Sequence, residues 1–162
     1  CCFWQPREGK SLQVLANLIL ATVMVAVTVS VHYGGLVALL ALLRNRPRRT
    51  ANRPLVLQGS AVLFVVLSLM LLHAVEIWLY AGLYRIAGAI PDLETALYFS
   101  TASFTTIGYG DVVLGPDWRL IGAIEGANGL LLFGWSTAFL TTTASQLSTL
   151  DHGWIQGTGD EN

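Results

Sequence analysis

Residues 105–111 read Thr-Thr-Ile-Gly-Tyr-Gly-Asp, and this short stretch decides the fold more than any other part of the chain. Gly108 and Gly110 lack a Cβ, so the backbone there can take positive φ angles that other residues avoid. This freedom lets an extended chain aim successive carbonyl oxygens to the same side. Thr106 adds a hydroxyl oxygen at one end of the row, and Tyr109 can point away from it. The stretch therefore predicts a column of oxygens that could replace the water shell of a cation, with a simple glycine-rich turn as the alternative.

The composition predicts a membrane protein independently of this stretch. The chain is 54% hydrophobic and only 12% charged, whereas soluble domains have about 25% charged residues. Its formal net charge is −1, so neither a polycation nor a polyanion such as nucleic acid is the expected partner. No nucleotide-binding, metal-binding or catalytic motif occurs, and we therefore do not expect an enzyme.

Three apolar stretches are long enough to cross a bilayer as helices, which takes ~20 residues. They cover residues 12–43, 55–84 and 118–143. The first holds 32 residues, or ~48 Å as one helix, which exceeds the ~30 Å hydrocarbon core. One long helix is the prediction, and two spans joined by a bend at Gly34 and Gly35 are the alternative.

The loop between the first two stretches sets the predicted orientation. Five of the nine basic residues fall within ten positions of this loop. They are Arg44, Arg46, Arg48, Arg49 and Arg53. Because cytoplasmic loops are rich in lysine and arginine, we expect this loop inside, and both the N-terminus and segment 85–117 outside. Carboxylates in that outer segment would concentrate cations near it. They belong to Asp92, Glu94, Asp111 and Asp117.

A short helix is predicted between the second apolar stretch and the oxygen column. Pro91 and Asp92 form a helix start signal, with Asp92 as the N-cap. The helix would run over residues 93–105, which is too short to cross a membrane. Such a segment re-enters the membrane only where protein or a water-filled cavity surrounds it. Its C-terminal end would direct partial negative charge toward a dehydrated cation.

In this order of elements, residues 55–145 resemble the pore module of tetrameric potassium channels: outer helix, pore helix, selectivity filter and inner helix. The family filter reads Thr-Val-Gly-Tyr-Gly, and this chain differs from it only at Ile107. The resemblance implies a passive channel for K⁺. It also implies a homotetramer, because one filter strand per chain cannot close a ring of four. The implied K⁺ ligands are Thr106, Ile107, Gly108 and Tyr109, with Gly110 at the mouth.

The resemblance also assigns roles around the filter. Asp111 is the acidic residue after the filter, and its partner on the pore helix would be Tyr98, since the neighbouring Phe99 has no hydroxyl. Gly129 falls at the family's hinge glycine, with close helix packing as the alternative. Ala102 stands where some members carry a carboxylate behind the filter. The cavity face of the inner helix would carry Leu130, Phe133, Thr137 and Thr141.

Ionisable residues inside the predicted spans are the least expected feature. His73 and Glu76 share a face of the second span, and Glu125 and Asn128 share a face of the third. Charges inside a membrane are costly unless they are paired or wetted, and they usually mark function. In the first interpretation these residues are a structural bracket, in which His73 or a Glu76–Glu125 pair forms hydrogen bonds behind the filter and holds it in shape. In the second interpretation they are a pH sensor, in which two close carboxylates share a proton and conductance responds to pH. A metal site of the kind built into helix bundles is a third interpretation.

The sequence as a whole predicts an all-α membrane protein that assembles as a tetramer, with three transmembrane helices, a re-entrant pore helix and a filter in each chain. Residues 1–54 would hold the extra first helix and the basic loop, 55–145 the pore module, and 146–162 a cytoplasmic tail. We expect no soluble ligand-binding domain on this chain, and lipid of a bacterial inner membrane around it. The alternatives to a potassium-selective channel are a non-selective cation channel and a non-conducting scaffold or modifying subunit.

Overall fold

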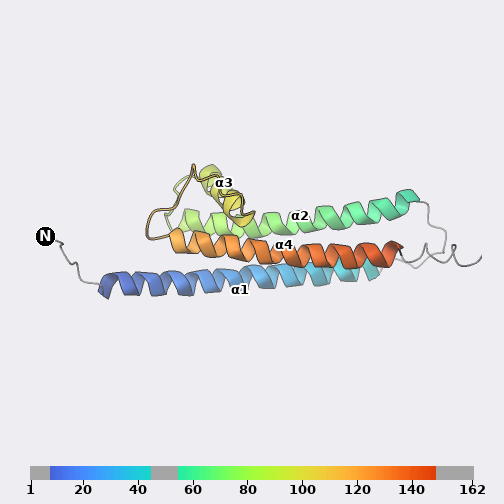
Figure 1. Ribbon diagram of the computed structural model, residues 1–162, viewed down its shortest axis with the longest axis horizontal. Coiled ribbons are helices and arrows are strands. Elements are labelled where there is room, and N and C mark those ends of the chain that lie inside the picture. The colour runs from blue at the N-terminus through green and yellow to red at the C-terminus, as the bar shows by residue number, and fades with distance from the viewer. Residues whose placement is uncertain (1–7, 45–54, 149–162) are drawn as a thin grey trace, which may run out of the picture.

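The computed structural model describes residues 8–44 and 55–148. Within these ranges the chain forms four helices and no strand, which agrees with the predicted all-α class. The helices are α1 (Glu8–Arg44), α2 (Leu55–Ile86), α3 (Leu93–Phe104) and α4 (Arg119–Ser148). The three long helices run side by side, and the short α3 lies against α2 and α4 near one end of the bundle (Figure 1).

Two parts of the predicted organisation fall beyond this description. The basic loop between α1 and α2 is described only at its first arginine, Arg44. The tail predicted for 146–162 is described only to residue 148, where α4 ends. Their assignment to the cytoplasmic side therefore stays a prediction.

The first helix is continuous. α1 contains 37 residues and passes Gly34 and Gly35 without a break, so the two-span alternative is wrong. Gly35 instead serves close packing, because a Cβ there would lie 2.6 Å from the side chain of Leu72 on α2. Both α1 and α2 are long and apolar enough to cross a membrane, over Lys10–Arg44 and Gly59–Ile86.

α4 is comparably long but less apolar. It holds 30 residues and lies alongside the two apolar helices. It does not qualify as a span on composition, since Glu125, Asn128 and several hydroxyl side chains interrupt its apolar surface. The structure thus gives two apolar spans among the described helices, and a third span at α4 stays a prediction.

α1 buries polar side chains as well as apolar ones, while many of its large apolar side chains are exposed. Asn17, Thr28 and His32 are buried against the other helices. The outer surface of α1 includes the exposed side chains of Leu12, Leu15, Ile19, Val23 and Val27. An apolar surface of this extent suits contact with lipid, while buried polar groups need partners inside the protein.

α3 forms where the start signal predicts it. The Asp92 carboxylate accepts hydrogen bonds from the backbone N–H and the hydroxyl of Thr95, both at 2.8 Å, and so caps the helix. α3 ends at Phe104, one residue before the predicted end. Its buried side packs into the core that α2 and α4 share, and this contact fixes the start of residues 105–118, which we call the filter loop after the role predicted for it. The largest buried side chains of that core are Tyr80, Tyr84, Phe104, Ile121 and Leu132.

Candidate functional site

The filter loop turns back onto the end of α3 and then adopts an alternating backbone. The Thr106 N–H donates to the Ser103 carbonyl and the Gly108 N–H to the Ala102 carbonyl, both at 3.0 Å. The φ angle is 61° at Thr106, 56° at Gly108 and 79° at Gly110. Among the described residues, Thr106 is the one non-glycine with a positive φ. Because this conformation costs roughly 1–2 kcal/mol for a residue with a Cβ, the surrounding contacts must hold it in place.

The alternation of positive and negative φ along the loop affects the direction of its carbonyl groups. Ile107 and Tyr109, which lie between the three residues of positive φ, keep the ordinary negative φ. Such alternation gathers successive N–H groups on one side of the backbone and leaves the carbonyl oxygens on the other. The side chains of Ile107 and Tyr109 are 55% and 69% exposed in the single chain.

A hydrogen bond between Tyr98 and Asp111 ties the middle of the filter loop to α3. The Tyr98 hydroxyl donates to Oδ2 of Asp111 at 2.7 Å, and the Val112 N–H donates to Oδ1 at 3.0 Å. The Tyr98 ring stacks on Tyr109, with centroids 6.4 Å apart and planes inclined by 12°. The bond from Tyr98 lowers the pKa of Asp111 below its ordinary value, and the same bond raises the pKa of Tyr98. The pairing that the resemblance implied is therefore present.

Glu125 of α4 connects the middle of α3 to α2. Its Oε1 accepts a hydrogen bond from the Ser100 hydroxyl at 2.5 Å, and its Oε2 accepts one from the Tyr84 hydroxyl at 2.6 Å. The Ser100 hydroxyl also lies 3.0 Å from the Ile77 carbonyl. Glu125, Tyr84 and Ser100 are all 0% exposed. A buried side chain of α4 thus joins α2, α3 and α4 through hydrogen bonds.

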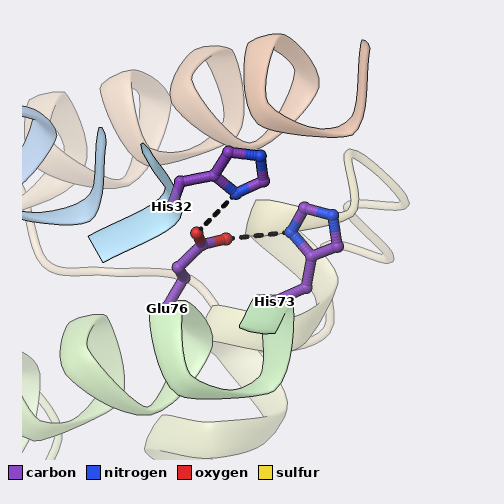
Figure 2. Close-up of side chains that lie close together, drawn as sticks. All are labelled: His32, His73 and Glu76. Atoms are coloured by element: carbon purple, nitrogen blue, oxygen red, sulfur yellow. Dashed lines mark hydrogen bonds and ion pairs between the residues drawn. The ribbon is translucent and has the colours of Figure 1, made fainter. Parts of the chain in front are cut away.

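A second buried cluster joins α1, α2 and α4. Glu76 accepts hydrogen bonds from two imidazoles, at 2.8 Å from Nδ1 of His32 and 2.9 Å from Nδ1 of His73 (Figure 2). The Ser136 hydroxyl on α4 lies 2.9 Å from Nε2 of His73 and 3.5 Å from Nε2 of His32. The four side chains close a ring of hydrogen bonds, which we call the imidazole ring cluster.

The two clusters correct one sequence-based expectation. Glu76 and Glu125 do not pair, because each carboxylate has both oxygens engaged with partners of its own cluster. The sensor interpretation, in which the two carboxylates share a proton, therefore lacks the contact that it requires. His73 does belong to a hydrogen-bonded cluster, but this cluster connects α2 to α1 and does not include Glu125.

Asn128 forms a third polar link between α1 and the rest of the bundle. Its amide Nδ2 donates to the Thr28 hydroxyl at 2.8 Å and to the Tyr80 hydroxyl at 3.3 Å. Nearer the N-terminal end of α1, the Asn17 amide donates to the backbone carbonyl of Asp117 in the filter loop. Polar contacts therefore fasten α1 at three levels, at Asn17, at Thr28 and at the imidazole ring cluster.

Gly129 lies in close contact with the pore helix. A Cβ at this position would stand 2.0 Å from the carbonyl oxygen of Phe104, the last residue of α3. α4 continues as a regular helix through Gly129. The geometry therefore accounts for this glycine by packing, and a bending role for it stays a prediction.

The four residues predicted to line a cavity are not equivalent. Leu130, Thr137 and Thr141 are exposed on α4 in the single chain. Phe133 is half-buried and points into the bundle, where its ring lies 4.2 Å from that of His73 and 5.8 Å from that of Phe104. The structure therefore leaves three of the four on a free surface and turns the fourth inward.

Several residues of these clusters could not be named from the sequence. The partners missed are Tyr84, Ser100, Thr28, His32 and Ser136. Serine, threonine and tyrosine are frequent in membrane helices, so only contact with a buried carboxylate marks them. His32 carried a signal, since it is the single histidine of a stretch without Asp, Glu, Lys or Arg, and ionisable residues inside a membrane span usually have a function.

Comparison with known proteins places the chain in a family. A family model described as "Ion channel" matches residues 61–146, more than half of the chain, and spans α2, α3, the filter loop and nearly all of α4. The chain therefore belongs to this family of pore-loop cation channels and is a membrane protein. Neither the search of curated proteins nor that of solved structures found a match.

Proposed function

We propose that four copies of this chain assemble into a potassium-selective channel, with K⁺ passing through a ring of four filter loops. The observation that carries the proposal is the alternation of φ at Thr106, Gly108 and Gly110. It leaves the carbonyl oxygens of consecutive residues on one side of the strand. Four such strands around an axis would offer the oxygen cages that replace the hydration shell of K⁺.

The exposure of the loop in the single chain supports assembly. Ile107, Tyr109 and Val113 are large apolar or aromatic side chains that remain mostly exposed. Leu130 and Leu131 of α4 are exposed as well, at 62% and 72%. In a four-fold ring, these side chains would lie at the contacts between neighbouring copies. Burial between copies would explain why apolar side chains are exposed in the single chain.

Electrostatics around the loop favour a cation. The C-terminal end of α3 carries partial negative charge and leads directly into Thr105 and Thr106. At the other end, Asp111 keeps its carboxylate ionised, because the Tyr98 hydrogen bond holds its pKa low. A permeating ion would thus meet negative potential at both ends of the filter.

In the proposed arrangement α4 is the third membrane span and the filter loop faces the outside. The arginine-rich loop after Arg44 then lies in the cytoplasm, as the positive-inside rule requires. This orientation puts the N-terminus outside and the C-terminus inside. The short connections between helices favour a bacterial inner membrane.

Flux through liposomes tests the proposal. Purified protein should carry K⁺ far faster than Na⁺, and Ba²⁺ should block the flux. Gly108→Ala should abolish K⁺ flux, because alanine cannot readily hold a φ of 56°. Gly115→Ala is the matched control, since Gly115 lies in the same loop with no atom within 4 Å of an added Cβ and no positive φ.

The outcomes separate the alternatives. Equal flux of K⁺ and Na⁺ would mean a non-selective cation channel. No flux from folded wild-type tetramers under any ionic condition would favour a scaffold or modifying subunit. If Gly108→Ala conducts as the wild type does, the filter assignment is wrong.

A further inference from the structure

The imidazole ring cluster contains side chains of the kinds that bind metal ions in proteins. One potential ligand atom from each of His32, His73 and Glu76 lies within 4.8 Å of the other two (Figure 2). The three side chains are 0%, 4% and 0% exposed. Two imidazoles and one carboxylate match the ligand sets that hold Zn²⁺ and related transition metals. We propose that His32, His73 and Glu76 form a binding site for a transition-metal dication such as Zn²⁺.

The distances require little rearrangement. Bonds of 2.0–2.2 Å in a tetrahedral site place ligand atoms roughly 3.3–3.5 Å apart. The carboxylate oxygens of Glu76 already face both Nδ1 atoms, at 2.8 and 2.9 Å. Side-chain shifts of about an ångström would therefore let all three groups converge on one ion. The ligands come from two packed helices, as in metal sites within helix bundles.

Ser136 supplies an outer partner for the ligands. When a histidine binds a metal through one ring nitrogen, it usually donates the other N–H to a nearby acceptor. Here the Ser136 hydroxyl oxygen lies 2.9 Å from Nε2 of His73 and 3.5 Å from Nε2 of His32. One oxygen can accept from both, because a hydroxyl has two lone pairs. Both imidazoles would then be neutral, with Nδ1 free for the metal.

Aromatic rings hold the two imidazoles in orientation. Phe133 lies 4.2 Å from the ring of His73, and Trp135 lies 5.4 Å from the ring of His32. Packing of this kind restricts the ligand rotamers and so lowers the entropic cost of binding.

The ligand chemistry distinguishes this site from the proposed K⁺ path. K⁺ prefers an all-oxygen cage, whereas imidazole nitrogen favours Zn²⁺, Co²⁺, Ni²⁺ and Cu²⁺. Three protein ligands leave one position for water or a small anion. Because His32 belongs to α1 and the other two to α2, a bound metal would clamp the first helix to the pore module. The proposed metal site does not depend on whether the protein conducts K⁺.

A direct test uses the full-length protein in detergent with competing ligands removed. The background carries Cys1→Ser, Cys2→Ser and His152→Gln, which eliminates both cysteines and the third of the three histidines. After incubation with Zn²⁺ and desalting, bound metal is measured by mass spectrometry, and Co²⁺ loading is followed by its visible absorption. We expect about one metal per chain, a tetrahedral or five-coordinate Co²⁺ spectrum, and a higher melting temperature.

Two variants locate the metal. His32→Gln removes a ligand, so it should lower affinity by more than about 100-fold, beyond the loss that an outer partner causes, and remove the Co²⁺ spectrum. Ser136→Ala should keep the stoichiometry but weaken affinity about 10- to 100-fold, because it removes only the outer partner. Absence of bound metal in the background protein overturns the proposal, whether or not the variants fold. Binding that survives His32→Gln with an unchanged spectrum overturns it as well.

Discussion

The contact between Gly129 and the pore helix gives a prediction that can be worked out from distances. In Gly129→Ala the added Cβ would lie 2.0 Å from the Phe104 carbonyl oxygen, 2.8 Å from its carbonyl carbon and 3.0 Å from its Cγ. Two of these atoms are backbone, so no side-chain rotation relieves the overlap. α4 and the end of α3 must move apart by more than about 1 Å to reach a normal contact.

The size of the effect follows from two opposing terms. Overpacking costs about 1–3 kcal/mol, and a backbone clash belongs at the upper end. Alanine in place of glycine within a helix returns about 0.5–1 kcal/mol. The net loss is therefore about 2 kcal/mol per chain, or more than a tenfold shift in the folding equilibrium. Because Phe104 precedes the filter loop directly, K⁺ flux should fall as well.

The assay compares the thermal stability of the purified Gly129→Ala protein with that of a matched variant on the same helix. Gly134→Ala is the control, since nothing lies within 4 Å of a Cβ at Gly134 in the chain. We expect Gly129→Ala to melt well below the wild type and Gly134→Ala to melt near it. If Gly129→Ala is as stable as the wild type and only its gating changes, the packing argument fails and the hinge role is favoured.

Two further predictions concern the supports of the filter. In Glu125→Gln the amide keeps one acceptor oxygen for the Tyr84 hydroxyl, and the Ser100 hydroxyl can donate to the Ile77 carbonyl instead. The variant therefore replaces hydrogen bonds to a charged group by hydrogen bonds between neutral groups, which costs about 1 kcal/mol per bond. The melting temperature of the purified protein should drop accordingly, and unchanged melting together with unchanged flux would mean that Glu125 does not support the filter. The Tyr98–Asp111 bond should make stability depend on pH on the acid side only. Because the pKa of Asp111 is lowered from 3.8 in the folded protein, its contribution is complete above that value and is lost as pH falls through the lower folded value. Melting measured from pH 2 to 6 should fall more steeply toward low pH for the wild type than for Asp111→Asn, and parallel curves would contradict this.

The parts of the site that the sequence predicts are those set by local chemistry. The N-cap of α3 follows from Pro91 and Asp92, and the alternating loop follows from glycines two residues apart. The Tyr98–Asp111 contact spans only 13 residues, and a hydroxyl at one of two candidate positions was enough to select it. In each case the partners are neighbours along the chain, so little depends on how the long helices pack.

The parts that the sequence does not predict depend on how the helices are rotated about their axes. In a soluble helix an apolar stripe marks the buried face, but α1 and α2 are apolar on nearly all sides. His32 and Glu76 are 44 residues apart, and only the packing of α1 against α2 brings them together. The same rotation directs Glu76 toward α1 and away from Glu125, so the Glu76–Glu125 pair expected from the sequence does not form.

The role of α1 is where the structure adds most. The sequence offers it only as an extra helix outside the pore module, and the family match likewise begins at residue 61. In the structure, the buried groups Asn17, Thr28 and His32 each bond to α2, α4 or the filter loop. Buried polar groups without partners are costly, so removal of α1 would expose or orphan Glu76 and Asn128.

The most direct test of the central claim is the reversal potential of the current that the purified protein carries in planar bilayers, with K⁺ on one side and Na⁺ on the other. The account predicts a reversal potential displaced far toward the K⁺ equilibrium potential, with the current blocked by Ba²⁺. A reversal potential near zero would contradict potassium selectivity, whatever the stability of the tetramer.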